Sequence, residues 1–155
     1  MTEASKFLRD LDIEILHQTG EADFDRVKKD YAEAGFTRGR VEKFIFEMAD
    51  AFRAAHLVVC RAGASSLAEL AAAGKAAVLI PLVSKDRHQE HNAKEMEKIG
   101  AALTFLQNEL TGEKLAGVLR TLYDDRERLA GLAARMAELH QPEAALRIAR
   151  GILEG

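Results

Sequence analysis

An apolar run, a turn of mostly small residues and an alanine-rich segment follow one another in the middle of the chain, and they constrain the fold most. Residues 57–60 are apolar and typical of a buried strand, and residues 61–64 form the turn. The alanine-rich segment predicts a helix that opens at Ser65 or Ser66 and ends at Gly74. The first N–H groups of a helix lack partners, and the helix dipole favours negative charge there. A strand, a glycine turn and a helix N-terminus therefore predict an anion site, with a nucleotide diphosphate as the first ligand to test.

Apolar runs alternate with helical patterns along the whole chain. Strands are predicted at residues 13–17, 41–45, 57–60, 77–80 and 102–106. Helices are predicted at residues 2–9, 24–34, 47–54, 66–73, 88–98, 112–122, 125–138 and 142–153. This alternation predicts a single α/β domain over residues 1–155, with a doubly wound, Rossmann-like parallel sheet covered by helices on both faces. Because ligands bind beyond the carboxyl ends of such strands, the loops after Phe44, Cys60 and Pro81 are expected at the ligand edge.

Composition excludes several classes of protein. The 155 residues suffice for a core, and 48% hydrophobic with 30% charged residues is ordinary for a soluble domain. A net charge of −3 gives no basic surplus for nucleic acid. The polar residues after Met1 predict no secretory signal, and no apolar run reaches the length of a membrane span. Cys60 is the only cysteine, which fits a reducing compartment, and we expect it to be a small core residue rather than a nucleophile.

Ser66-Leu67-Ala68-Glu69 has two interpretations. The spacing Ser-x-x-Glu matches a capping box, in which Ser66 accepts from a backbone N–H and Glu69 reaches back to the cap N–H. Alternatively, the Glu69 carboxylate, one turn into a helix beside an anion site, accepts hydrogen bonds from the two hydroxyls of a ribose. The sequence leaves both interpretations open.

Residues 84–92 form a second polar cluster after a predicted strand. One interpretation is a helix start, with Asp86 as its cap. The other is a row of neutral donors, His88, Gln89 and Asn92, that face sugar hydroxyls. His88 and His91 are three residues apart, but no third ligand accompanies them at a suitable spacing, so no metal site is expected.

Phe44 and Ile45 are predicted to end the second strand. They are either plain core residues or an edge whose apolar side chains cover a flat base while the backbone reads its polar atoms. A lone histidine at the end of the first predicted strand, His17, is most often structural, and it receives no role.

Six short motifs together resemble a known family. They are His17-Gln-Thr-Gly20, Tyr31-Ala-Glu-Ala-Gly35, Phe44-Ile-Phe-Glu-Met-Ala49, Val58-Val-Cys-Arg-Ala-Gly-Ala64, Glu69-Leu-Ala-Ala-Ala-Gly74, and Lys85-Asp-Arg-His-Gln89 with Asn92-Ala93. In this order and spacing they closely resemble the carboxyl-terminal half of the MurG family, from about residue 11 to the end. This family comprises the peptidoglycan glycosyltransferases that add N-acetylglucosamine to lipid I and so make lipid II.

The resemblance implies a fold and a donor site. The family has two Rossmann-like domains in the GT-B arrangement, and the carboxyl-terminal one binds UDP-N-acetylglucosamine without a metal or other cofactor. By position, Ile45 would read uracil through its backbone, and the turn from Gly63 through Ala64, Ser65 and Ser66 would meet the diphosphate. Glu69, next to Leu67 and Ala68 on the same helix, would hold the ribose, and His88 and Gln89 would contact the sugar hydroxyls. The resemblance also implies a cytoplasmic enzyme, peripheral to the inner face of the cell membrane.

Two parts of the family pattern are not found in this sequence. One is the amino-terminal acceptor domain, which would carry the lipid-facing surface, the lipid I site and the general base, so the catalytic residue stays unassigned and the chain alone is expected to be inactive. The other is the first strand of the donor domain, which is central in the order 3-2-1-4-5-6. Without it we expect a perturbed sheet, whose compensation includes a homodimer, because unpaired edges invite association.

Three other functions compete with this one. The chain is alternatively a non-catalytic or donor-binding subunit of a split GT-B glycosyltransferase, or part of a GT-B enzyme that uses another UDP-sugar and acceptor. A dehydrogenase is disfavoured, because the sequence has no Gly-x-Gly-x-x-Gly and its glycine turn follows the third predicted strand.

Overall fold

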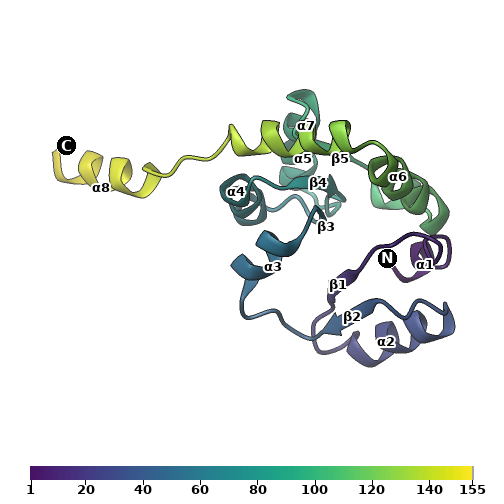
Figure 1. The fold of residues 1–155 in the computed structure, drawn as a ribbon. Coiled ribbons are helices and arrows are strands. Elements are labelled where there is room, and N and C mark those ends of the chain that lie inside the picture. Colours follow the sequence, from purple (N-terminus) through teal and green to yellow (C-terminus); the bar gives the residue numbers. More distant parts are fainter. Residues whose placement is uncertain (155) are drawn as a thin grey trace. The chain divides into compact units, whose positions relative to one another are not determined.

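The computed structural model describes residues 1–154 as an α/β chain whose strand pairs are all parallel (Figure 1). Its strands are β1 (Ile15–Gln18), β2 (Gly39–Glu42), β3 (Leu57–Cys60), β4 (Ala76–Leu79) and β5 (Ala102–Thr104). Its helices are α1 (Thr2–Ser5), α2 (Phe24–Glu33), α3 (Met48–Ala54), α4 (Ala64–Ala73), α5 (His88–Lys98), α6 (Gly112–Asp124), α7 (Arg126–Ala137) and α8 (Ala144–Glu154), with a short 3-10 helix at Gln107–Glu109. The predicted α/β class with parallel strands and intervening helices is confirmed.

The strands of residues 1–154 form two sheets. β1 pairs with β2, and β3, β4 and β5 form a second sheet in that order. In a Rossmann-like sheet the strands lie in the order 3-2-1-4-5-6, so the first strand is central. A sheet without that strand would leave one group of two paired strands and one of three, and these are the groups observed. The expectation of a perturbed sheet is therefore confirmed, because these strands form two sheets rather than one.

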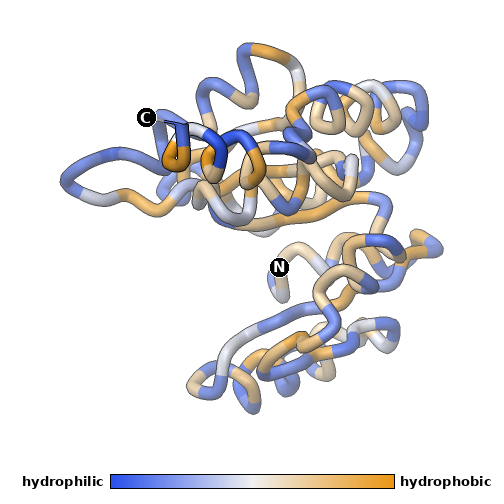
Figure 2. The backbone as a smooth tube through the Cα atoms, turned by 90° about the vertical axis from the view of Figure 1, so that its left-hand side faces the viewer, coloured by the Kyte–Doolittle hydropathy of each residue, from blue (hydrophilic) through white to orange (hydrophobic). Residues whose placement is uncertain are grey.

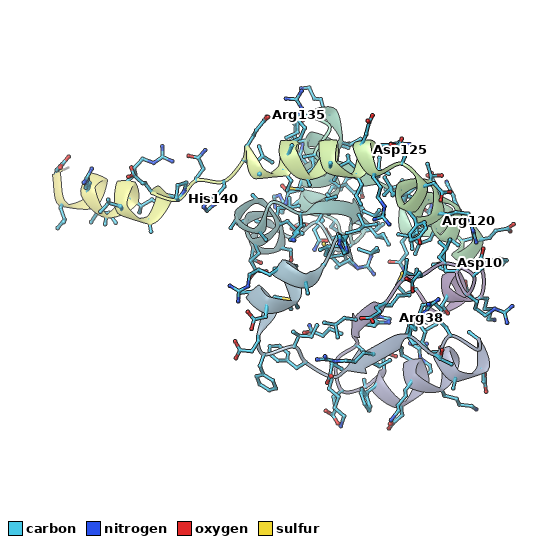
Figure 3. All side chains as sticks on the ribbon, viewed as in Figure 1. Asp10, Arg38, Arg120, Asp125, Arg135 and His140 are labelled. Atoms are coloured by element: carbon cyan, nitrogen blue, oxygen red, sulfur yellow. The ribbon has the colours of Figure 1, made fainter. Side chains whose placement is uncertain are left out.

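The chain divides into two compact units. Unit 1 comprises residues 1–55 and 105–129, and unit 2 comprises residues 56–104 and 130–155. In unit 1, α1 packs against α6 and α2, and the side chains of Ala4 and Ser5 on α1 are fully buried. Arg120 on α6 holds the segment after α1, because its guanidinium binds Asp10 at 2.7 and 2.8 Å (Figure 3).

Unit 2 is built around β4, the most buried strand of the chain. All four residues of β4 are fully buried, since β3 and β5 pair with its two edges. Leu70 and Ala71 on α4 and Ala93 on α5 add to this core. Gly74 ends α4 with φ of 59°, a left-handed conformation that favours glycine, as the sequence predicts.

The last helix, α8, has an apolar face that the rest of the structure leaves exposed. Ile148, Ile152 and Leu153 are 65%, 76% and 85% exposed. Figure 2 shows hydrophobic and hydrophilic residues alternating around the helix beside the label C. No helix among residues 1–154 combines the length and hydropathy needed to cross a membrane.

Two predicted boundaries are wrong in ways that matter for the site. β2 ends at Glu42, so Phe44 and Ile45 lie in the loop before α3 rather than at the end of a strand. The helix predicted to open at Ser65 or Ser66 begins at Ala64.

We predict that Gly112→Ala destabilises the protein, whereas Gly117→Ala does not. A Cβ at position 112 would clash with Glu3 Cβ and lie 2.9 Å from the Glu3 carbonyl carbon, so α1 would have to move away from α6. Overpacking of this kind costs about 1–3 kcal/mol. Gly117 lies on the same helix, and a Cβ added there would meet nothing within 4 Å, so alanine raises helix propensity without a clash. Urea unfolding of both variants measures the difference, and equal midpoints would contradict the tight α1–α6 contact.

Candidate functional site

The N-terminus of α4 presents backbone donors that no side chain caps. Gly63 is the N-cap residue, with φ of −69° and ψ of 146°, and no side chain accepts a hydrogen bond at this cap. The first intrahelical bond runs from the Leu67 N–H to the Gly63 carbonyl at 3.0 Å. The N–H groups of residues 64–66 precede that bond and have no partner within the helix. Together with the helix dipole, they form a site suited to an anion.

The capping-box interpretation of Ser66 and Glu69 is wrong. Because the helix begins at Ala64, Ser66 is its third residue and Glu69 its sixth, so neither stands at the position that a capping box requires. The Glu69 side chain is exposed. Its carboxylate is therefore available to a ligand on the surface of α4. In the chain, Leu67 and Ala68 lie between Glu69 and the first three residues of the helix.

Gly63 leaves room over the turn. A Cβ added to Gly63 would meet nothing closer than Ser66 Oγ at 3.8 Å, an ordinary contact, and its φ is one that any residue adopts. The fold itself therefore does not require glycine at this position. A ligand that lies close to the backbone here would require glycine, because a Cβ would occupy the space of the ligand.

Parallel pairing brings the loop after β3 and the loop after β4 to one edge of the sheet, as expected. Cys60 pairs with Leu79, and the Ile80 N–H donates to the Cys60 carbonyl at 2.8 Å. Arg61 Nη1 donates to the Ile80 carbonyl at 3.1 Å, and Asn92 Nδ2 donates to the Ala62 carbonyl at 3.0 Å.

Asn92 thus donates to the turn after β3, and it is not a free donor beside His88 and Gln89. It directs the Ala62 carbonyl toward α5. In a trans peptide the carbonyl and the following N–H point in opposite directions, so the Gly63 N–H points the other way. The contact between Asn92 and Ala62 therefore orients a donor at the start of the anion site.

His88 and Gln89 are the first two residues of α5. The His88 side chain is exposed, with Nε2 3.5 Å from Asp86 Oδ2. Gln89 Oε1 accepts from the Leu82 N–H at 3.0 Å, which leaves the Gln89 amide nitrogen as the donor for a ligand. Among residues 1–154, no three or more His, Cys, Asp or Glu side chains are grouped so that they could hold a metal ion.

Arg87, not Asp86, caps α5, so the prediction for Asp86 is wrong. Arg87 has φ of 52°, a left-handed conformation that costs free energy for a residue with a side chain. Its guanidinium binds the buried Glu90 carboxylate at 2.7 and 3.1 Å. These hydrogen bonds lower the pKa of Glu90 and link the residue that caps α5 to the first turn of the helix. Asp86 instead accepts from the Ser84 hydroxyl, which lowers the pKa of Asp86.

Ile45 belongs to unit 1. It lies in the loop between β2 and α3, and its N–H donates to Gln18 Oε1 at 2.8 Å. Sequence reasoning missed Gln18. The signal was present, because Gln18 ends β1 and pairs with Glu42, the last residue of β2, so the two loops that follow start side by side.

The Cys60 thiol at the end of β3 is an unreactive group. Burial first, and the negative charge of Glu69 second, raise the pKa of the thiol to about 11. Because the thiolate is the nucleophilic form, Cys60 is protonated and inert near neutral pH, as the sequence predicts.

Comparison with known proteins defines the family. Residues 1–148 match the family model described as the glycosyltransferase family 28 C-terminal domain. The chain belongs to this glycosyltransferase family.

Particular relatives are bacterial. The chain is 46% identical to a UDP-N-acetylglucosamine–N-acetylmuramyl-(pentapeptide) pyrophosphoryl-undecaprenol N-acetylglucosamine transferase of Myxococcus xanthus over 96% of this chain and 39% of that protein. It is 43% identical to the protein of the same description from Nitratidesulfovibrio vulgaris over 95% of this chain and 40% of that protein. The crystal structure of MurG from Acinetobacter baumannii matches 97% of this chain and 44% of that one, with a TM-score of 0.87 and 35% identity. The chain thus spans about two fifths of the length of the relatives it matches.

One more distant structure shares only the fold. The glycosyltransferase VinC, crystallised with dTDP, has a TM-score of 0.72 over 99% of this chain at 18% identity.

We predict that Glu69→Gln makes Cys60 more reactive. Removing the carboxylate charge lowers the pKa of the thiol, so the thiolate fraction at a given pH rises and alkylation accelerates. Rates of iodoacetamide labelling between pH 8 and 10, followed by mass spectrometry, measure this effect. Cys60→Ser is the control for labelling elsewhere. A rate that Glu69→Gln leaves unchanged would show that the carboxylate does not face the thiol.

Proposed function

We propose that this chain binds the donor UDP-N-acetylglucosamine for the glycosyltransferase that converts lipid I to lipid II in peptidoglycan synthesis. The observation that carries the proposal is the uncapped N-terminus of α4, with Glu69 on the same helix and the start of α5 tied to the same turn. This arrangement offers donors for a diphosphate, an acceptor for ribose hydroxyls and neutral groups for a sugar. The relatives that carry the transferase description support the identity of donor and acceptor.

The role of each proposed residue follows from its chemistry. The N–H groups of Gly63, Ala64, Ser65 and Ser66 face the diphosphate, and the Glu69 carboxylate accepts from the two ribose hydroxyls. His88 and the amide nitrogen of Gln89 bind hydroxyls of N-acetylglucosamine. The backbone of Ile45 binds uracil.

The reaction proposed is an inverting transfer. A hydroxyl of the acceptor attacks the anomeric carbon and forms the new glycosidic bond, the bond to the UDP oxygen breaks, and the hydroxyl proton passes to a general base. Charge accumulates on the departing diphosphate, so fixed backbone donors stabilise the transition state more than the ground state. We propose that the base, the lipid I site and the membrane-facing surface belong to an amino-terminal acceptor domain of the kind the family has, and that the enzyme acts at the cytoplasmic face of the membrane.

We predict that the chain binds UDP and UDP-N-acetylglucosamine and that Glu69→Gln weakens both. Loss of hydrogen bonds to a charged acceptor costs about tenfold in affinity or more. Isothermal titration calorimetry at millimolar nucleotide measures the effect. Glu97→Gln, the same change at an exposed position on α5, is the matched control and should bind as the wild type does.

Two results would contradict the proposal. One is the absence of UDP binding by the wild type at millimolar nucleotide, and the other is a Glu69→Gln variant that binds like Glu97→Gln. Competition by UDP-glucose equal to that by UDP-N-acetylglucosamine would favour a transferase that uses another UDP-sugar.

We also propose that two copies of the chain associate. β1 and β3 each pair with one neighbour in the part of the chain that the structure describes, and strands with an open edge promote pairing between chains. Light scattering after size exclusion should give twice the chain mass of 17.0 kDa as concentration rises. A mass of 17.0 kDa at every concentration would contradict this association.

A further inference from the structure

The edge of β2 that faces away from β1 carries backbone groups that the ladder does not use. Along a strand, the N–H and C=O groups of successive residues point to opposite edges. The Thr19 N–H donates to the Glu42 carbonyl at 3.0 Å, so residues 40 and 42 direct these groups to the β1 side. The N–H and C=O groups of Gly39 and Val41 therefore point outward, and outside the β1–β2 ladder no hydrogen bond among residues 1–154 uses them.

The side chains of β2 divide into a charged face and an apolar face. Arg40 and Glu42 share one face, where Arg40 Nε donates to Glu42 Oε1 at 2.9 Å, and their side chains are 73% and 39% exposed. Val41 lies on the other face and lines a hollow of about 310 Å³ together with Tyr31 and Phe36. No residue of β1 lines this hollow, which therefore opens beside the outer edge of β2.

The charges along β2 are complementary to those of a second, antiparallel copy of the same strand. A two-fold axis at Val41 would place Arg40 of each copy opposite Glu42 of the other. In that register Val41 would exchange two backbone hydrogen bonds with Val41 of the second copy. A shift by two residues would place Arg40 opposite Arg40, and like charges at directly opposed positions are unfavourable. The charge pattern therefore favours one register.

We propose that the outer edge of β2 is an interface between two copies of this chain. The copies pair antiparallel about Val41, with two Arg40–Glu42 ion pairs across the axis, and the hollow beside Val41 has room for the valine of the second copy. This inference rests on the association proposed above and assigns it to β2 rather than to β1 or β3, which contain no Asp, Glu, Lys or Arg. The paired segment is short, so the association occurs only at high protein concentration.

Charge reversal tests the pairing. Arg40→Glu and Glu42→Arg each turn two attractive pairs into repulsive ones, and we expect each variant to associate about tenfold more weakly than the wild type. The double variant Arg40→Glu/Glu42→Arg restores both pairs and should regain the wild-type association. Arg135→Glu, the same change of charge on α7, is the matched control. Sedimentation equilibrium over a range of concentrations gives the dissociation constants.

A cysteine at the two-fold axis gives an independent measure. In a Cys60→Ser background, Val41→Cys should form a disulfide-linked dimer under mild oxidation, because residues that are directly opposed in an antiparallel pair lie within the reach of a disulfide. Val83→Cys, at a valine of unit 2 that is 64% exposed, is the control and should stay unlinked at the same concentration.

The outcomes separate this inference from the association on which it rests. If the wild type associates and both single charge reversals associate equally well, the copies meet through another edge, and the inference is overturned while the association stands. Cross-linking of Val41→Cys no stronger than that of Val83→Cys would overturn it in the same way. A wild type that keeps a mass of 17.0 kDa at every concentration overturns the inference and the association together.

Discussion

The parallel pairing of β3 with β4 is the interaction on which the candidate site of unit 2 depends. It places the carboxyl ends of both strands at one edge, and the backbone bond from Ile80 to Cys60 continues the pairing beyond the last ladder residues. Once the two loops start together, single side chains suffice to fix them, as Arg61 and Asn92 do. Without the pairing, the donors of α4 and the polar residues at the start of α5 would have no fixed relation.

The groups proposed to bind the donor are mostly backbone atoms at a helix terminus. Such donors are positioned by the fold, and they do not have to be ordered when a ligand arrives, which lowers the entropic cost of binding. In this proposal the few side chains of the site, Glu69 above all, would add selectivity, and the preference for a negatively charged ligand would come from the helix. The first turn of α4 therefore forms without a side-chain cap, and its backbone N–H groups stay available to a ligand.

Much of the fold could be predicted because local signals agree with tertiary packing. Residues 57–60 are continuously apolar and form β3 as predicted, and Gly74 ends α4 because its φ requires glycine. α5 matches its predicted range for the same reason, with Gly100 past its end also at positive φ. In these segments periodicity, turn residues and burial indicate the same structure.

The details of the site were harder to predict, because they depend on contacts between distant segments. The sequence is compatible with a helix that starts at a capping box on Ser66 or at a glycine cap. The extended backbone of Gly63 makes it the N-cap, so the helix begins at Ala64. The Asn92 contact with Ala62 spans 30 residues, and the Gln18 contact with Ile45 spans 27, so neither leaves a periodic signal. The position of Ile45 was misjudged because Val41 through Ile45 look like a strand, although pairing with β1 ends at Glu42.

Position 87 imposes two opposing demands on the chain. Its left-handed backbone suits glycine, whereas the buried carboxylate of Glu90 needs a cation next to it. Arginine satisfies the second demand at the expense of the first. Glycine at this position would relax the backbone and remove the guanidinium that hydrogen-bonds Glu90, so the residue that strains the loop is also the one that pairs this buried acid.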